Sequence, residues 1–217
     1  MIRSKVALVS SLIILGICRY LFFPFPNNVM FEARSSFMSF PIRNQDGYIP
    51  LGIIGSFLFI IAIILIVMGM KKYQFRTIVI VFIVYTFFPN LLIYVYQETL
   101  ASGISAISYD GEGRCNFEYV KEDLLEGECN LVLHNRSSED VTFELEFLDS
   151  YIMEDELRTE SLMNVAGPYI ITIEANSEKS IHLKELLDLS NVPKHIEGGT
   201  SNNIHLKLIE NGKTRIL

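Results

Sequence analysis

The side chains best suited to chemistry in this sequence are four histidines and three cysteines, and their spacing matches no metal-binding or catalytic motif. There is no HExxH helix, no CxxC pair, no GxSxG turn and no phosphate-binding glycine loop. We therefore expect no catalytic residue, no metal site and no cofactor, and predict that the protein is not an enzyme. Two of the histidines, His182 and His205, alternate with apolar core positions and are expected to face solvent.

Cys115 and Cys129 are the pair that could form a disulfide. Both occupy the inward positions of segments in which apolar residues alternate with polar ones. A bridge between them would close a loop of about 15 residues and add about 3 kcal/mol. A simple hairpin around residues 121–127 would not place them opposite one another, so a bridge and two buried thiols both remain open. Cys18, in an apolar run, is expected to lie in lipid.

The charge of the chain is divided between its two halves. Residues 1–100 hold eight Lys and Arg against three Asp and Glu, a net charge of +5, whereas residues 101–217 hold ten against 22, a net charge of −12. Half of all residues are apolar and the mean hydropathy is +0.32, which is unusual for a single soluble domain. We expect a membrane portion followed by an acidic, water-exposed domain that does not bind nucleic acid.

Two apolar stretches are long enough to cross a bilayer. Residues 47–70 carry no charge for 24 residues, and residues 77–97 carry none for 21. About 20 apolar residues in a helix suffice to cross a hydrocarbon core of about 30 Å. The sequence therefore predicts membrane spans over about residues 51–70 and 77–96.

The first apolar segment, about residues 6–25, is interrupted by Arg19. We interpret it as a further span with Arg19 near its outer end, where the long side chain can reach the lipid headgroups. The alternative is a cleaved signal peptide. Small residues suited to cleavage are scarce here, since only Gly16 and Cys18 come near the required spacing.

The positive charges orient these spans. Lys71, Lys72 and Arg76 lie in the short turn between the second and third spans, and Arg3 and Lys5 lie in the N-terminal tail. Positively charged residues accumulate on the cytoplasmic side of membrane proteins. We therefore expect the tail and the turn in the cytoplasm, and the chain after the third span outside the cell membrane. Cleavage of the first segment would not change this orientation.

Pro89 and Asn90 are the polar or kinking residues deep in the third predicted span. Proline removes a backbone hydrogen bond, and an amide in hydrocarbon seeks a partner on a neighbouring helix. Because no Asp, Glu, Lys or His accompanies them in the spans, we favour helix packing over an ion or ligand path. Gly52 and Ser56 have the spacing of a small-residue contact between helices.

From residue 114 onward apolar residues recur with period two, which is typical of half-buried strands. Residues 141–147 show this pattern most clearly, and Asn211-Gly212 is a strong hairpin signal. Residues 97–113 are small and rich in glycine, as in a linker. The expected fold is an α-helical membrane anchor with three transmembrane helices over residues 1–96, followed by an all-β, immunoglobulin-like sandwich of seven or eight strands over residues 114–217.

The runs over residues 131–135, 141–145 and 173–181 resemble the bacterial immunoglobulin-like and fibronectin-like modules attached to envelope proteins. The resemblance covers residues 113–217 as a general pattern, and the buried tryptophan of antibody domains is absent. It implies an interaction or spacer module outside the cell membrane and no activity. Asn135-Arg136-Ser137 fits a glycosylation sequon in an expected turn.

These features predict a non-catalytic, multi-pass protein of the cell membrane. We expect it to display the acidic β-sandwich outside for protein interaction or envelope assembly. The alternative is an auxiliary subunit of a membrane transporter or channel complex, whose helices contact partner helices through Asn90 and Gly52. The expected partners are the lipid bilayer and another membrane or envelope protein, and the sequence sets no oligomeric state.

Overall fold

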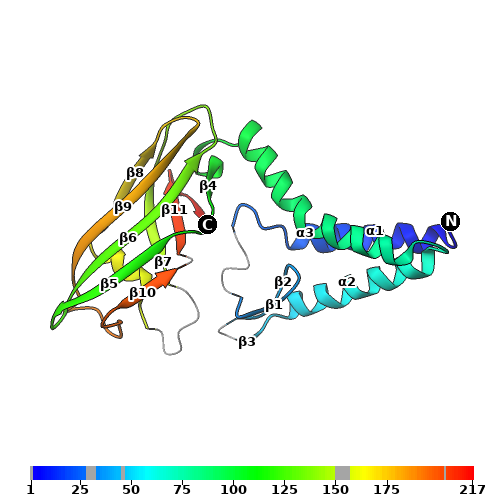
Figure 1. The fold of residues 1–217 in the computed structure, drawn as a ribbon, viewed down its shortest axis with the longest axis horizontal. Coiled ribbons are helices and arrows are strands. Elements are labelled where there is room, and N and C mark those ends of the chain that lie inside the picture. The colour runs from blue at the N-terminus through cyan, green and yellow to red at the C-terminus, as the bar shows by residue number, and fades with distance from the viewer. Residues whose placement is uncertain (1, 28–32, 45–46, 150–156, 203) are drawn as a thin grey trace. The chain divides into compact units, whose positions relative to one another are not determined.

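The chain divides into two compact units, residues 1–94 and residues 95–217. The computed structural model describes residues 2–27, 33–44, 47–149, 157–202 and 204–217. The first unit is largely helical, whereas the second is built mainly of β-strands (Figure 1).

The first unit contains three helices and a small β-ribbon among its described residues. The helices are α1 (Lys5–Leu21), α2 (Pro50–Gly69) and α3 (Gln74–Thr99), and the ribbon is formed by β1 (Ser35–Phe37), β2 (Phe40–Asn44) and β3 (Gly47–Tyr48). Of the helices described, α2 and α3 are long and apolar enough to cross a membrane. They match the second and third predicted spans, whereas α1 has 17 residues and ends before the predicted limit at residue 25.

Glycines let the chain pack closely against α2. A Cβ atom added to Gly55 would lie 2.8 Å from the rings of both Phe22 and Phe40, and one added to Gly52 would collide with the carbonyl oxygen of Pro41. Phe40 is fully buried and contacts Phe22 edge to face, with 4.9 Å between ring centroids. The ribbon is therefore part of the core of the helical unit. Gly52 contacts the chain's own ribbon, so it offers no surface to a partner helix.

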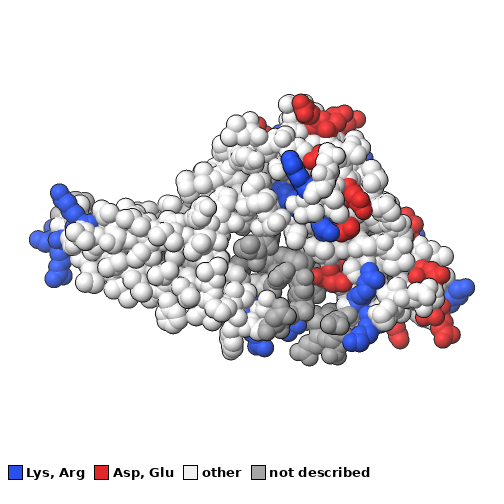
Figure 2. Space-filling view, turned by 180° about the vertical axis from the view of Figure 1, so that it is seen from behind, with Lys and Arg blue, Asp and Glu red and all other residues white. Residues whose placement is uncertain are grey.

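The N-terminal tail and the turn between α2 and α3 meet at one end of the helical unit. The backbone N–H of Arg3 donates to the carbonyl of Gly69 at 2.7 Å. The Gln74 amide donates to the carbonyls of Val67 and Met70 at 2.8 and 2.9 Å, which satisfies the C-terminal end of α2. Basic side chains gather at this end (Figure 2).

The second unit contains two antiparallel sheets. In the first sheet, β6 (Leu124–Asn135) pairs along one edge with β9 (Ser177–Asp188). Its other edge pairs with β5 (Arg114–Lys121) and, further along, with β4 (Ile107–Tyr109), while β10 (Gly199–Asn202) extends the sheet beyond β5. The second sheet has the order β12 (Lys213–Ile216), β11 (His205–Glu210), β7 (Val141–Leu148) and β8 (Tyr169–Ile173).

The buried side chains of both sheets form one hydrophobic cluster. On β7, Val141, Phe143, Leu145 and Phe147 are buried while the residues between them are partly or fully exposed, as the period-two pattern predicts. The Asn211-Gly212 turn joins β11 to β12, and both residues have the positive φ of such hairpins, 49° and 77°. A largely β C-terminal region in antiparallel sheets is thus confirmed.

The segment over residues 97–113, for which the sequence predicts a linker, contains regular structure. It holds the 3-10 helix η1 (Gly103–Ala106) and strand β4, and Ile104, Ala106 and Ile107 are buried. A second 3-10 helix, η2 (Glu160–Val165), places Leu162 and Met163 in the same core.

Candidate functional site

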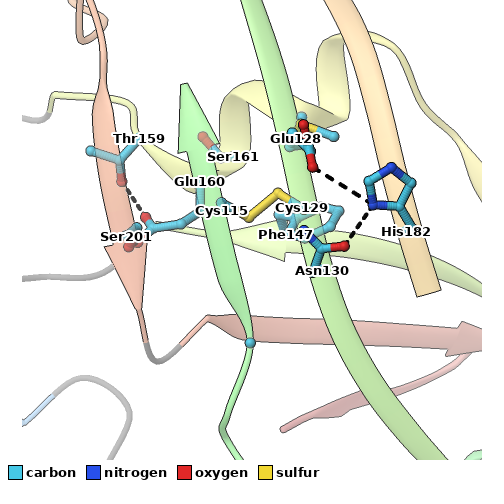
Figure 3. The surroundings of a disulfide bond; sticks show 12 residues. Cys115, Glu128, Cys129, Asn130, Phe147, Thr159, Glu160, Ser161, His182 and Ser201 are labelled. Carbon is cyan, nitrogen blue, oxygen red and sulfur yellow. Dashed lines mark hydrogen bonds and ion pairs between the residues drawn. A yellow bond between two sulfur atoms is a disulfide. The ribbon is translucent and has the colours of Figure 1, made fainter. Parts of the chain in front are cut away.

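Cys115 and Cys129 are joined by a disulfide in the second unit (Figure 3). They are direct cross-strand partners on β5 and β6, with 4.1 Å between their Cα atoms. The turn predicted around residues 121–127, which would have kept the two cysteines from lying opposite each other, is wrong. The chain turns at Glu122 and Asp123 instead, where Asp123 adopts a left-handed φ of 57°, and a register shift after Tyr119 brings the cysteines opposite each other.

The polar side chains around the disulfide form hydrogen-bonded pairs. The Glu160 carboxylate is buried and accepts hydrogen bonds from the hydroxyls of Thr159 and Ser201. On another strand, Nδ1 of the exposed His182 lies 2.6 Å from the Asn130 side-chain oxygen (Figure 3). Within the described residues no group of three or more His, Cys, Asp or Glu is placed to hold a metal ion.

His205 differs from the expectation that it faces solvent. It lies on β11 opposite Leu148 and is half-buried. Burial lowers the pKa of His205 below its ordinary value, and a hydrogen bond from its side chain to the Leu217 backbone and the nearby Glu160 charge partly oppose that shift.

Asn135 is a structural residue. Its side chain is fully buried, and Nδ2 donates to the carbonyls of Glu139, Ile173 and Glu174 at 2.8 to 3.1 Å. Its Oδ1 accepts from both the backbone N–H and the hydroxyl of Ser137, at 3.0 and 2.8 Å. The nitrogen that a glycan would need is thus enclosed and used, so the sequon is not a modification site of the folded unit.

Arg215 is a buried cation of the second unit, at 5% exposed. Its Nη1 donates to the carbonyls of Ile104, Ser105 and Ile107 at 2.6 to 2.9 Å. The Gln97 amide, at the C-terminal end of α3, donates to two of the same carbonyls. Burial lowers the pKa of Arg215 to about 10, yet the carbonyl oxygens compensate for much of the lost hydration. Arg215 therefore holds η1 and β4 in place.

Arg19 lies in a different environment, in the helical unit. Its Nε and Nη1 atoms are buried and have no hydrogen-bond partner among the described residues, and the same holds for the hydroxyl of Tyr85. The guanidinium carbon is 5.3 Å from the centre of the Tyr85 ring. Such a cation–π contact contributes about 0.5–2 kcal/mol but does not satisfy Nε and Nη1 as hydrogen-bond donors.

A cavity of about 840 Å³ borders Arg19 between α1 and α3. Besides Arg19 and Tyr85, its lining is almost wholly apolar: Leu12, Leu15, Gly16, Tyr20, Leu21, Phe23, Phe25, Ile80, Val81, Val84, Phe88, Pro89 and Leu92. The structure thus brings together two of the residues singled out in the sequence, Arg19 and Pro89. Asn90 does not line this cavity and is exposed on α3.

The level of Arg19 along the helices follows from the aromatic rings beside it. The Tyr85 ring lies 4.9 Å from that of Phe59, and Phe59 is the tenth of the twenty residues of α2. Each end of α2 is therefore about 14 Å away along its axis. Arg19 itself stands in the last turn of α1, near the end of that helix as predicted, but its guanidinium lies beside the Tyr85 ring, which contacts Phe59 in the middle of α2. A charged side chain at that depth of a bilayer costs about 2.5–3.5 kcal/mol.

The basic turn residues are exposed, as their proposed position at a membrane surface requires. Lys71, Lys72 and Arg76 are all exposed, and the Arg76 guanidinium lies 5.4 Å from the centre of the Tyr73 ring. These side chains form no enclosed site. Their arrangement suits contact with water and headgroups.

Sequence reasoning missed the pairing of Arg19 with Tyr85. A signal was present, because the buried residues Leu15, Cys18 and Phe22 form a helical stripe that Arg19 adjoins. Tyr85 stands in a uniformly apolar stretch and carried no such signal. Comparison with known proteins adds no assignment, since no family model, no curated protein and no solved structure matches this chain.

Proposed function

We propose that this protein is a non-catalytic, multi-pass protein of the cell membrane that displays its acidic β-unit on the outer side, where that unit binds another protein. The observation that carries the proposal is the disulfide between Cys115 and Cys129. Disulfides persist in oxidising compartments outside the cytosol. The apolar helices α2 and α3 supply the membrane attachment.

The distribution of basic residues supports the same orientation. The tail with Arg3 and Lys5 is hydrogen-bonded to the end of α2, directly beside the turn with Lys71 and Lys72. Positive charge concentrated at one end of a membrane unit favours the cytoplasmic side for that end. With this end inside, a membrane-spanning α3 leads to the outside, as the disulfide in the following unit requires.

We further propose that α1 is a third span. It has 17 residues, about 25 Å of helix, and it exposes Val9, Leu12, Ile13 and Ile17 on its surface. In water this apolar face would be unfavourable, whereas lipid would cover it at no cost. The apolar chain after Leu21 adds to the length available in the membrane.

The strand pairing supports an immunoglobulin-like sandwich for the β-unit. In the first sheet β4, β6 and β9 pair as strands A, B and E do in that fold. In the second sheet β8, β7, β11 and β12 pair in the order C′, C, F and G. Strands β5 and β10 are then an addition on one edge, and the disulfide joins this addition to β6 within one sheet rather than joining the two sheets.

The outward face of the first sheet favours a basic protein partner. Glu118 lies directly opposite Glu126, and Glu128 lies two residues further along β6. Lys184 lies between these carboxylates, 2.7 Å from Glu126 and 3.7 Å from Glu128. Acidic side chains are spread over the β-unit in Figure 2. A basic surface would be attracted to this face, whereas anionic lipid and nucleic acid would be repelled.

Two measurements on intact cells test the proposal. A reporter that is active only outside the cytosol, fused after Leu217, is expected to be active. A reporter after Lys72, in the basic turn, is expected to be inactive and serves as the matched control. Proteolysis of the β-unit in intact cells, before any lysis, is the second expected result. Activity of the C-terminal reporter only in the cytosol would overturn the proposal.

A second candidate function is an auxiliary subunit of a membrane transporter or channel complex. Asn90, exposed on the apolar helix α3, favours it, because an amide in hydrocarbon gains from a partner on another helix. Truncation separates the two functions. If residues 95–217 alone capture the partner that the whole chain binds, display is favoured; if binding needs residues 50–97, the subunit role is favoured.

A further inference from the structure

We infer that the cavity between α1 and α3 receives a carboxylate from a transmembrane helix of a partner protein, paired with the Arg19 guanidinium. The inference rests on the proposed insertion of the helical unit into a membrane. It goes beyond that proposal by naming the chemistry that the partner must bring into the bilayer.

Arg19 and Tyr85 have hydrogen-bond donors that other described residues do not use. Arg19 Nε and Nη1 are buried and lack hydrogen-bond partners among the described residues, and so does the Tyr85 hydroxyl nearby. The Tyr85 ring lies 5.3 Å from the guanidinium carbon and supplies no acceptor to the Nε and Nη1 donors. A guanidinium presents its N–H groups as a planar fork that matches the two oxygens of a carboxylate, and a tyrosine hydroxyl can donate a further bond.

The cavity beside Arg19 is an apolar groove between two helices. The cavity holds about 840 Å³, and Leu12 and Leu15 from α1 face Ile80, Val84 and Phe88 from α3 across it. An apolar groove between two helices is the surface against which a third helix packs in a membrane. The single cation in that lining then decides which helices are accepted.

The depth of the Arg19 guanidinium in the proposed membrane favours a protein carboxylate over a lipid phosphate as its partner. Although Arg19 is in the last turn of α1, its guanidinium lies beside the Tyr85 ring, which contacts Phe59 in the middle of α2. Lipid phosphates lie at the membrane surface, about 15 Å from the middle of the hydrocarbon core. An Asp or Glu in the middle of a transmembrane helix reaches this level without bending the bilayer, and such residues in membranes characteristically pair with a basic one.

A second copy of this chain has no carboxylate in its helices at the level of the Arg19 guanidinium. Helices α1 and α2, and α3 up to Tyr94, contain no Asp or Glu. The acidic residue of α3 is Glu98, in its last turn and within the second unit. A second copy therefore cannot bring a carboxylate to the middle of the membrane. The partner is a different protein.

The experiment uses the full chain reconstituted in phosphatidylcholine vesicles at neutral pH. The probe is a synthetic polyleucine transmembrane peptide with one central Glu, and its control has Leu at that position. Association is measured by energy transfer between labels on peptide and protein. We expect the Glu peptide to associate at least tenfold more tightly than the Leu peptide, and Arg19→Gln to abolish the difference.

A matched control variant is available in the ribbon. Arg43 is stacked on Tyr48 at 5.9 Å, much as Arg19 is on Tyr85, but Arg43 is exposed. Arg43→Gln is therefore expected to keep the full preference for the Glu peptide. The charge-reversed variant Arg19→Glu should prefer a peptide with a central Lys, which shows that a loss in Arg19→Gln is not caused by misfolding.

Three results would overturn the inference. One is equal association of the Glu and Leu peptides with the unaltered chain. Another is a preference that survives Arg19→Gln. The third is Arg19-dependent retention of a labelled anionic phospholipid without discrimination between the peptides, which would assign the site to lipid. Because the vesicle assay does not depend on orientation in cells, its failure is distinguishable from failure of the reporter experiment.

Discussion

Replacing Asn135 with alanine is expected to destabilise the β-unit strongly, although Asn135 lies at the end of strand β6. The side chain is fully buried and joins three parts of the chain. Its amide donates to carbonyls in the β6–β7 connection and at the end of β8, and its oxygen accepts from Ser137. Alanine removes every one of these contacts and fills none of the space.

The size of the loss follows from the groups left behind. The backbone N–H of Ser137, a residue 7% exposed, loses its acceptor at 3.0 Å, and an orphaned buried donor costs about 1–3 kcal/mol. The amide has two hydrogens, which the three carbonyls share, so its hydrogen bonds together contribute about 2 kcal/mol. We therefore expect the free energy of unfolding to fall by about 3–5 kcal/mol, a large part of the total for a domain of this size.

The measurement is urea unfolding of a fragment of residues 95–217, followed by circular dichroism. With an m-value of about 2 kcal/mol/M, the midpoint should fall by about 2 M. Asn130→Ala is the matched control, because Asn130 lies on the same strand but is exposed; its midpoint should stay within about 0.3 M, as for other surface changes. Equal, small shifts for both variants would refute the reasoning.

Asn135→Asp separates the role of the amide from that of the oxygen. The variant keeps an acceptor for Ser137, but a carboxylate oxygen then faces the carbonyls of Glu139 and Ile173. Burial and these carbonyls favour the protonated acid, so the folded-state pKa of the new carboxyl is expected to rise above its unfolded value. The native state then binds a proton more tightly, and Asn135→Asp should recover stability as the pH falls from 7 to 5. Loss of stability over that range would contradict the geometry.

Three further predictions concern other parts of the molecule. The double variant Cys115→Ala/Cys129→Ala should lower the free energy of unfolding by about 3 kcal/mol, and reductant should have a similar effect on the unaltered chain; insensitivity to reductant would exclude the bridge. Since the folded-state pKa of His205 is lowered, the unfolded chain binds the proton first on acidification. Stability should therefore fall from pH 7 toward pH 5, and His205→Gln should flatten this dependence in urea titrations. Gly55→Val, whose added carbon meets two phenylalanine rings, should lower the melting temperature in detergent by overpacking, a cost of about 1–3 kcal/mol, whereas Gly16→Val, with open space around it, should have little effect.

The strands predicted from the sequence are those whose inner face is continuously apolar. Strand β7 is the clearest case, because its four buried positions are all large and apolar. Strand β6 begins earlier than predicted, since Gly127 occupies a core position where a Cβ would lie 2.7 Å from the Met163 sulfur. A glycine there breaks the hydrophobic pattern while meeting a packing requirement. The sequence therefore placed the turn between β5 and β6 too far along the chain, and for that reason it did not predict that the two cysteines lie opposite each other.

Short or polar strands left no periodic signal. Strand β10 consists of Gly199, Thr200, Ser201 and Asn202, and it is held by pairing with β5 rather than by burial of apolar side chains. Strand β4 has three residues and lies in a segment whose small residues favour a linker. In both cases tertiary pairing, which no local pattern encodes, decides the structure.

Two arginines with buried side-chain nitrogens, Arg19 and Arg215, show why position in the sequence did not separate a structural residue from a candidate functional one. Arg215 alternates with exposed positions on a terminal strand, yet it is 5% exposed and donates to three carbonyls that turn inward at η1 and β4. Its charge is satisfied within its own unit. Arg19 interrupts an apolar helix, and its buried Nε and Nη1 find no acceptor among the described residues. Since a buried cation without acceptors is costly in any low-dielectric surrounding, the first arginine stabilises the fold as it stands, and the second gains from a partner that brings the missing carboxylate.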